Sequence, residues 1–277
     1  MSLRSVKLRP MKLRPILAIV LRQLYLLRQS PVRIFGLVVW VTIDIVLWGF
    51  ITRYLNTVSG SGVNFVPTLL GAVLLWDFSE RIMQGVSTAF LEDVWSRNFL
   101  NLFSSPLSIA EYILGLVITS MLTSSLGLVT MLVVATAVFQ LQFFTLGVSL
   151  AAFILVLFVF GISLGILATA IVLRFGPAAE WLLWPLPALL SPFAAVFYPL
   201  AILPPWMQAV ARALPPAYVF EGMRGLLAGG AFPTRLLLEG GCVAVAELCA
   251  VAYLYARVYR RAVRTGLLAR YSAEGVT

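Results

Sequence analysis

Residues 76–115 read WDFSERIMQGVSTAFLEDVWSRNFLNLFSSPLSIAEYILG and contain the end of one apolar segment, a charged and polar turn, and the start of a second apolar segment. The apolar run that begins at Val66 ends at Thr88, and a second begins at Tyr112. Residues 89–111 instead mix acidic, basic, amide and aromatic side chains. This stretch predicts two antiparallel helices joined by a folded polar connector.

The composition of the chain defines its class. Hydrophobic residues make up 61% of the 277 positions and charged residues 11%, and the mean hydropathy is +0.99. These values are typical of polytopic membrane proteins and lie far outside the range of soluble domains. A helix of about 20 residues crosses a hydrocarbon core of about 30 Å. Runs long enough to do so are Ile34–Tyr54, Val66–Thr88, Tyr112–Phe139, Thr145–Arg174, Trp181–Phe197 and Leu236–Tyr259.

We therefore expect an all-α fold with six transmembrane helices in one domain, residues 1–277. The fifth run contains Pro185, Pro187 and Pro192, which predicts a kinked or broken helix there. The expected order is a cytoplasmic amphipathic helix (1–33), spans one and two (34–88), a cytoplasmic connector (89–111), spans three to five (112–197), an outer hairpin (198–235), span six (236–259) and a cytoplasmic tail (260–277).

The basic residues predict the orientation of the chain, because Lys and Arg are retained on the cytoplasmic side. Eight of them precede the first span without a single acid: Arg4, Lys7, Arg9, Lys12, Arg14, Arg22, Arg28 and Arg33. Five more end the chain: Arg257, Arg260, Arg261, Arg264 and Arg270. Both termini are thus expected in the cytoplasm, which six spans satisfy. The sequence pI of about 10.1 has the same origin and does not indicate nucleic-acid binding.

The N-terminal region has the spacing of an amphipathic helix. Its apolar residues recur at helical intervals, namely Ile16, Leu17, Val20, Leu21, Leu24 and Leu27. Arg and Gln side chains occupy the remaining face, and Pro31 separates the segment from the first span. We expect a retained helix lying along the inner leaflet rather than a cleaved targeting peptide.

Several kinds of chemistry are absent from the sequence. The chain has no histidine, and its two cysteines, Cys242 and Cys249, are seven positions apart on one predicted helix. A metal cluster or a histidine-based catalytic site is therefore not expected. No G-x-x-x-x-G-K-[ST] sequence occurs, so no P-loop of this chain can bind ATP. We expect no enzymatic activity and no cofactor in this chain.

Charged residues within the predicted spans are the first candidate site. Asp44 lies in the first span, and Asp77, Glu80 and Arg81 lie in the second. An unpartnered charge at mid-membrane costs roughly 2.5–3.5 kcal/mol on an insertion scale, so these groups should pair. Asp77 and Arg81 are four positions apart and share a helical face, and Arg81 can also extend toward Asp44. Two interpretations stay open: a polar element of a translocation path, or an ion cluster that fixes helix packing. Glu247 in the last span is a weaker case of the same kind.

A pair of glycines in the fourth span has the spacing of a close helix contact. Gly161 and Gly165 form a G-x-x-x-G pattern, which lets two helix backbones approach. We expect it to serve packing within the chain rather than a dimer seam.

Residues 198–235 are apolar but interrupted by prolines at 199, 204, 205, 215, 216 and 233. A continuous span is excluded there. Two short helices, about Pro205–Ala213 and Ala217–Ala228, that dip into the outer leaflet fit both the apolar composition and the breaks. Glu221 and Arg224 are three positions apart and can pair inside this hairpin.

The polar connector has the pattern of a short two-faced helix over Leu91–Asn101. Its apolar members are Leu91, Val94, Trp95, Phe99 and Leu100, and its polar members are Glu92, Asp93, Arg97, Asn98 and Asn101. Ser104 and Ser105 before Pro106 would end it. A solvated loop is the alternative, but a simple connector would not need Trp95 and Phe99.

The series YPLAILPPWMQAVARALPPAYVFEGMRGLLAGG at residues 198–230 resembles the permease subunits of type-2 ATP-binding-cassette exporters, as do the Ser-Ser-Pro of the connector and the overall topology. The resemblance covers essentially the whole chain. It implies that two permease chains pair in a bacterial cytoplasmic membrane, that separate ATPase subunits carrying ATP and Mg dock beneath them, and that an amphipathic substrate is exported. Polysaccharide lipids, teichoic-acid lipids, drugs and peptides stay open as substrates.

The resemblance also implies roles for particular residues. A coupling helix within Leu91–Leu107 would contact the ATPase, and the N-terminal helix would brace the ATPase. The polar and aromatic contacts of the coupling helix would be Glu92, Asp93, Trp95, Arg97, Asn98 and Asn101. Residues 198–231 would form a re-entrant outer gate that includes Pro204, Pro205, Trp206, Glu221 and Arg224. Two other functions remain: a six-span secondary transporter driven by an ion gradient through Asp44, Asp77 and Glu247, and a membrane scaffold or insertase without a transported substrate.

Overall fold

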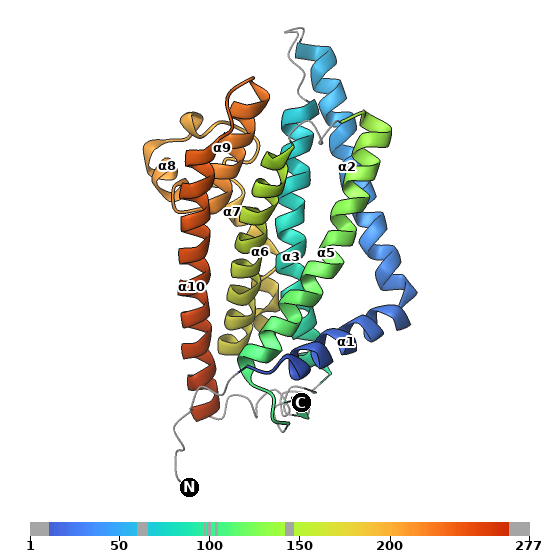
Figure 1. The fold of residues 1–277 in the computed structure, drawn as a ribbon, viewed down its shortest axis with the longest axis vertical. Coiled ribbons are helices and arrows are strands. Elements are labelled where there is room, and N and C mark those ends of the chain that lie inside the picture. Colours follow the sequence, from blue (N-terminus) through green and yellow to red (C-terminus); the bar gives the residue numbers. More distant parts are fainter. Residues whose placement is uncertain are drawn as a thin grey trace.

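The computed structural model describes residues 11–59, 66–96, 98, 101–102, 105–141 and 147–265, and these ranges contain helices and no strand (Figure 1). The α-helices are α1 (Leu13–Gln29), α2 (Pro31–Ser59), α3 (Gly71–Trp95), α5 (Ile109–Phe139), α6 (Val148–Phe175), α7 (Pro185–Leu190), α8 (Pro205–Ala211), α9 (Pro215–Leu227) and α10 (Thr234–Arg264). A π-helical turn, η1 (Val66–Leu70), leads into α3. The predicted all-α class is confirmed.

Within the described ranges, four helices are long and apolar enough to cross a membrane, and they occupy Pro31–Val58, Ile109–Phe139, Val148–Phe175 and Thr234–Arg264. They correspond to the predicted spans one, three, four and six. Helix α3 has 25 residues, which is about 37 Å of helix. It also carries Asp77, Glu80, Arg81, Glu92 and Asp93, so its length matches a span while its composition does not.

The region predicted as the fifth span is broken into short pieces. A 3₁₀ helix, η3 (Pro177–Leu182), is followed by the six-residue α7 and then by turns. Pro185 and Pro187 stand at the start of α7, where a missing backbone N–H is tolerated, and Pro192 follows its end. The predicted break is confirmed, and prolines are its physical cause.

Helix α6 lies at the centre of the bundle, packed against α3 on one side and α10 on the other (Figure 1). The contact with α3 depends on two glycines. A Cβ at Gly161 would lie 2.7 Å from the carbonyl oxygen of Ser79, and one at Gly165 would lie 2.8 Å from Cβ of Val86. The G-x-x-x-G pattern therefore serves packing within the chain, as predicted.

Helix α1 lies across the lower end of the bundle in Figure 1, against α5. Ile16, Ile19 and Val20 form its buried stripe, while Leu17 and Leu21 are exposed. Gly115 of α5 lets Ile19 approach closely, since a Cβ there would lie 2.6 Å from Ile19 Cγ2. The helix is confirmed, but its buried stripe differs from the predicted apolar face: it includes Ile19, which was not predicted, and lacks Leu17 and Leu21.

The segment 198–235 contains the two short helices that the sequence predicts. They are α8 and α9, which run from Pro205 to Ala211 and from Pro215 to Leu227. Pro stands at the first positions of both helices, so the prolines that exclude a continuous span also start these two elements.

The prediction of a separate helix over Leu91–Asn101 is wrong for the first half of that range. Helix α3 continues past Thr88 without interruption and ends at Trp95. The reason is that Ile82, Val86, Phe90 and Val94 continue one buried stripe at four-residue intervals, and no proline or terminal glycine stops the helix before Ser96. Residues 91–95 therefore belong to a long helix of the bundle.

Candidate functional site

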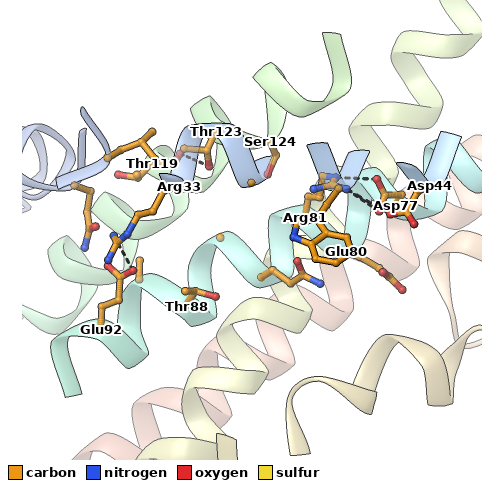
Figure 2. Close-up of a pocket in the computed structure, with 17 residues that line it drawn as sticks. Arg33, Asp44, Asp77, Glu80, Arg81, Thr88, Glu92, Thr119, Thr123 and Ser124 are labelled. Atoms are coloured by element: carbon orange, nitrogen blue, oxygen red, sulfur yellow. Dashed lines mark hydrogen bonds and ion pairs between the residues drawn. The ribbon is translucent and has the colours of Figure 1, made fainter. Parts of the chain in front are cut away.

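A polar cavity of about 550 Å³ lies between α1, α2, α3 and α5 (Figure 2). Its lining includes charged side chains at two levels along α3. Asp44, Asp77, Glu80 and Arg81 form one group, and Arg33 and Glu92 form the other (Figure 2). Threonine and serine hydroxyls of α5 line the wall between them, at Thr119, Thr123 and Ser124. All four predicted intramembrane polar residues thus meet in one cavity.

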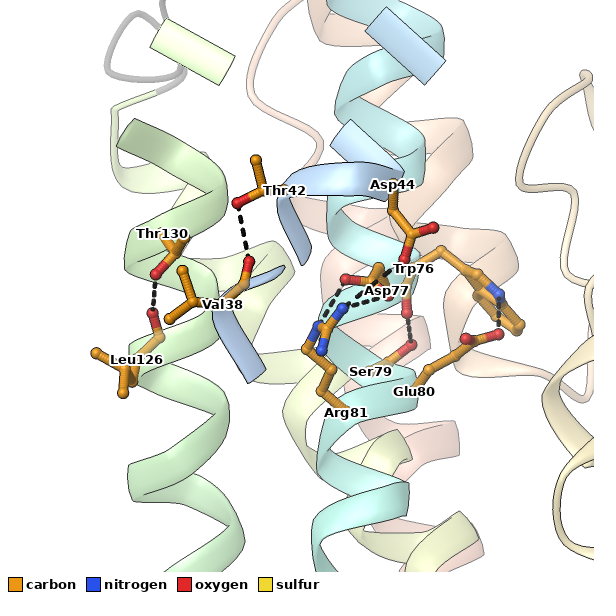
Figure 3. Close-up of polar contacts among 10 residues, drawn as sticks. All are labelled: Val38, Thr42, Asp44, Trp76, Asp77, Ser79, Glu80, Arg81, Leu126 and Thr130. Atoms are coloured by element: carbon orange, nitrogen blue, oxygen red, sulfur yellow. Dashed lines mark hydrogen bonds and ion pairs between the residues drawn. The ribbon is translucent and has the colours of Figure 1, made fainter. Parts of the chain in front are cut away.

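The group on α3 contains the predicted ion pair (Figure 3). Arg81 Nε donates to Asp77 Oδ2 at 2.7 Å, and its Nη2 donates to Asp77 Oδ1 at 3.3 Å. The same Nη2 lies 3.9 Å from Asp44 Oδ2 on α2. Asp44 and Asp77 therefore share one level on neighbouring helices, as the spacing predicts. The contact with Asp44 is the weaker one, because the Asp44 side chain is 45% exposed.

Glu80 has a neutral partner on its own helix. Its Oε1 accepts a hydrogen bond of 2.8 Å from the indole Nε1 of Trp76 (Figure 3). No cation forms an ion pair with Glu80 among the described residues. The group thus holds three carboxylates and one guanidinium.

The second charged group closes the end of the cavity beside α1. Arg33 Nη1 pairs with Glu92 Oε1 at 2.8 Å, which joins the start of α2 to the last turns of α3 (Figure 2). Gln23 of α1 also lines the cavity, and its buried amide nitrogen has no hydrogen-bond partner among the described residues.

Asp93 is the centre of a buried polar junction between α1, α3 and α5. Its side chain is fully buried. It accepts two hydrogen bonds from the Arg22 guanidinium, from Nη1 at 3.1 Å and from Nη2 at a shorter distance, and a third at 2.7 Å from the hydroxyl of Tyr112. The hydrogen bond with Asp93 raises the pKa of Arg22 above its ordinary value, so the guanidinium remains charged.

Glu111 makes a second link between α1 and α5. It forms a capping box with Ser108: Glu111 N donates to Ser108 Oγ at 3.2 Å, and Ser108 N donates to Glu111 Oε2 at 2.9 Å. Its other oxygen accepts from the backbone N–H of Lys12 at 2.7 Å. We name the inner junction as the set Arg22, Arg33, Glu92, Asp93, Glu111 and Tyr112. It fixes α1 to the ends of α3 and α5 that flank the connector.

The residues predicted to contact an ATPase have different surroundings. Asp93 points into the bundle, and Glu92 faces the cavity. Trp95 is 52% exposed, and its Nε1 donates to Glu180 of η3 at 2.9 Å. The backbone N–H of Asn98 donates to the carbonyl of Asp93 at 3.0 Å. Asn101 is exposed, and Arg97 lies outside the described residues.

The predicted outer-gate residues fall into an exposed set and an internal set. Pro204 and Pro205 begin α8, and Trp206 is 63% exposed with its ring against Phe193. Glu221 and Arg224 instead point inward. Glu221 Oε1 accepts from Arg224 at 2.9 Å and from the backbone N–H of Leu200, and Arg224 also donates to the carbonyl of Val196 at 3.3 Å. This pair holds α9 against the chain that precedes α8.

Two further features concern ions. Within the described ranges, no three His, Cys, Asp or Glu side chains are grouped so that they could hold a metal. Glu247 of α10 is half-buried, and its buried Oε2 has no hydrogen-bond partner in the part of the chain that the structure describes. Glu247 does not line the cavity, so the structure does not bring it together with Asp44 and Asp77.

Sequence reasoning missed most of the inner junction. Arg22 and Tyr112 were not predicted to bind Asp93, because 71 and 19 positions separate them from it in the sequence. Glu111 could have been found, since S-x-x-E before an apolar run is the signature of a capping box.

Long apolar helices around a cavity with charged side chains in its lining are typical of a membrane protein. A family model described as ABC-2 type transporter matches residues 16–228. The match covers more than half of the chain, so the chain belongs to the ABC-2 type transporter family. It is therefore a multi-pass membrane protein and a transport subunit rather than an enzyme. Comparison with curated proteins gives no match.

Proposed function

We propose that this chain is the permease subunit of an ATP-driven exporter, which provides the path for an amphipathic substrate and receives mechanical work from a separate ATPase. The observation that carries the proposal is the family match over residues 16–228. Members of this family pair with an ATPase subunit, and this chain has no P-loop of its own.

Six membrane crossings complete the proposed topology. Four are the long apolar helices, and we assign the other two to α3 and to the broken segment 177–197. The charges of α3 are compatible with a crossing because its side chains pack against α5 and α6 or face the polar cavity rather than lipid. Six crossings place both termini on the cytoplasmic side, in agreement with their basic residues.

Coupling would pass through the connector between α3 and α5. Trp95 and Asn101 are exposed there and would meet a partner, whereas Asp93 is enclosed in the inner junction. A push on the connector would act on α3 and α5 together, and through Arg22 on α1. Closure of an ATPase dimer by ATP would in this way shift the helices that line the cavity between two states. We also propose that the permease functions as a homodimer, with residues 198–231 as its outer gate.

Purification from native membranes tests this function. The tagged chain, solubilised in mild detergent, should bring down an ATP-binding-cassette ATPase, and the complex should hydrolyse ATP in a vanadate-sensitive manner. Trp95→Ala should weaken this association, with the similarly exposed Trp206→Ala of α8 as the control. A chain that exports its substrate without any ATPase would refute the proposal.

An ion-driven secondary transporter is the second candidate. The observation that favours it is the buried, unpartnered oxygen of Glu247 together with the carboxylates of the cavity. Glu247 does not line the cavity, which counts against a single ion pathway through Asp44, Asp77 and Glu247. Transport that persists with ATP depleted and stops when ion gradients are collapsed would favour this candidate.

A further inference from the structure

The described lining of the cavity carries more carboxylates than cations. Asp44, Asp77, Glu80 and Glu92 line it, and Arg33 and Arg81 are the basic side chains among the lining residues. Arg33 is matched by Glu92 at 2.8 Å, and Arg81 is matched by Asp77 at 2.7 Å. Two formal negative charges are left over, at Asp44 and Glu80. Both lie beside the Asp77–Arg81 pair (Figure 2).

The surroundings of these two carboxylates leave room for a positive ligand. Asp44 is reached only at 3.9 Å by Arg81, which is already held by Asp77. Glu80 accepts from the indole of Trp76, a neutral donor. A carboxylate away from water is stabilised far more by a nearby cation than by a neutral hydrogen bond.

A second, independent observation is that one polar group of the cavity lining has no hydrogen-bond partner among the described residues. Gln23 is 6% exposed and lines the cavity, and its amide nitrogen has no hydrogen-bond partner. Leaving such a buried donor unpaired costs about 1–3 kcal/mol. The apolar side chains of Leu27 and Trp40 also contribute to the lining, so the cavity offers both polar and apolar contacts.

We propose that this cavity binds amphipathic organic cations, with the positive group between Asp44 and Glu80 and the apolar part against Trp40. This inference rests on the proposed function and narrows its substrate class. A lipid with a polyphosphate headgroup is disfavoured, because the net negative charge of the cavity lining would repel it. A cationic amphiphile instead compensates this charge.

Binding of two ions of matched size and opposite charge tests the proposal. Tetraphenylphosphonium and tetraphenylborate are titrated into the purified chain in non-ionic detergent, and saturable binding is measured by equilibrium dialysis. Tetraphenylphosphonium should bind saturably, and its Kd should rise about tenfold or more in the double variant Asp44→Asn/Glu80→Gln. Both replacements keep side-chain shape, and the amide oxygen that Glu80→Gln introduces can still accept from Trp76. Glu239→Gln is the control, since Glu239 pairs with Arg235 on α10 outside the cavity.

Each outcome decides the proposal. Absence of saturable tetraphenylphosphonium binding, equal binding by the double variant, or tetraphenylborate binding of the same strength would overturn it. If the double variant does not fold, Asp44→Asn alone carries the test, because the Asp44 side chain is 45% exposed and its replacement disturbs little packing. The assay needs no ATPase, so a chain that copurifies with an ATPase but does not bind the cation refutes this inference and leaves the proposed function standing.

Discussion

Removal of the Arg22 guanidinium should destabilise the inner junction strongly, because it leaves the buried Asp93 without its cation. In Arg22→Met, Asp93 loses two of its three hydrogen bonds and its counter-charge while remaining fully buried. Breaking a buried pair from one side costs about 3–5 kcal/mol. The lower end, about 3 kcal/mol, applies here, because Arg22 is 28% exposed and Tyr112 still donates to Asp93.

Thermal unfolding in detergent, followed by tryptophan fluorescence, measures this effect. A loss of about 3 kcal/mol should lower Tm by about 6–12 °C for a chain of this size. Arg28→Met is the matched control, since Arg28 is exposed on the same helix and should shift Tm by no more than about 1–2 °C, equivalent to about 0.5 kcal/mol. The double variant Arg22→Met/Asp93→Asn should recover part of the loss, because no buried charge is then left unpaired. Equal Tm values for Arg22→Met and Arg28→Met would show that the junction does not hold α1.

Three further predictions concern the bundle and the hairpin. Gly161→Ala and Gly165→Ala should each lower the free energy of unfolding by about 1–3 kcal/mol through overpacking against α3. Gly241→Ala is the control, because Gly241 has open space around it and its replacement should not destabilise the protein. Equal thermal stability of all three variants would contradict the contact. Asp77→Asn and Arg81→Met should each lower Tm while the joint replacement recovers much of it; selective loss of transport with normal folding of both single variants would instead assign the pair to the path. A cysteine at exposed Ala228, with Cys242 and Cys249 replaced, should react with an impermeant maleimide from the outside; labelling only from the cytoplasmic side would reject the topology.

Local spacing predicted the features whose partners lie within one or two helical turns. Asp77 and Arg81 pair because four positions bring them onto one face, and prolines define α8 and α9 because they cannot occupy a helix interior. The stripe of α1 follows from residue periodicity in the same way.

Contacts between distant segments could not be predicted from one sequence. Asp93 was expected to contact an ATPase as a polar residue of the connector, yet Arg22 and Tyr112 bind its fully buried side chain. Trp95 was expected to face a partner, and it is exposed, but its indole also binds Glu180, 85 positions away. The partners of both residues depend on how α1, α3 and η3 pack, and no local pattern records that packing.

The central claim is that an ATPase drives movement of this permease. The most direct test is whether the accessibility of the outer hairpin changes when the ATPase binds nucleotide. Ala209 is exposed on α8 and is replaced by cysteine in a chain without Cys242 and Cys249. The rate of maleimide labelling is then measured in the purified permease–ATPase complex, without nucleotide and after trapping with ATP and vanadate. Coupling predicts a rate change of several fold on trapping that disappears when the ATPase subunit is removed. Identical rates in both states, in a complex that hydrolyses ATP, would contradict the account.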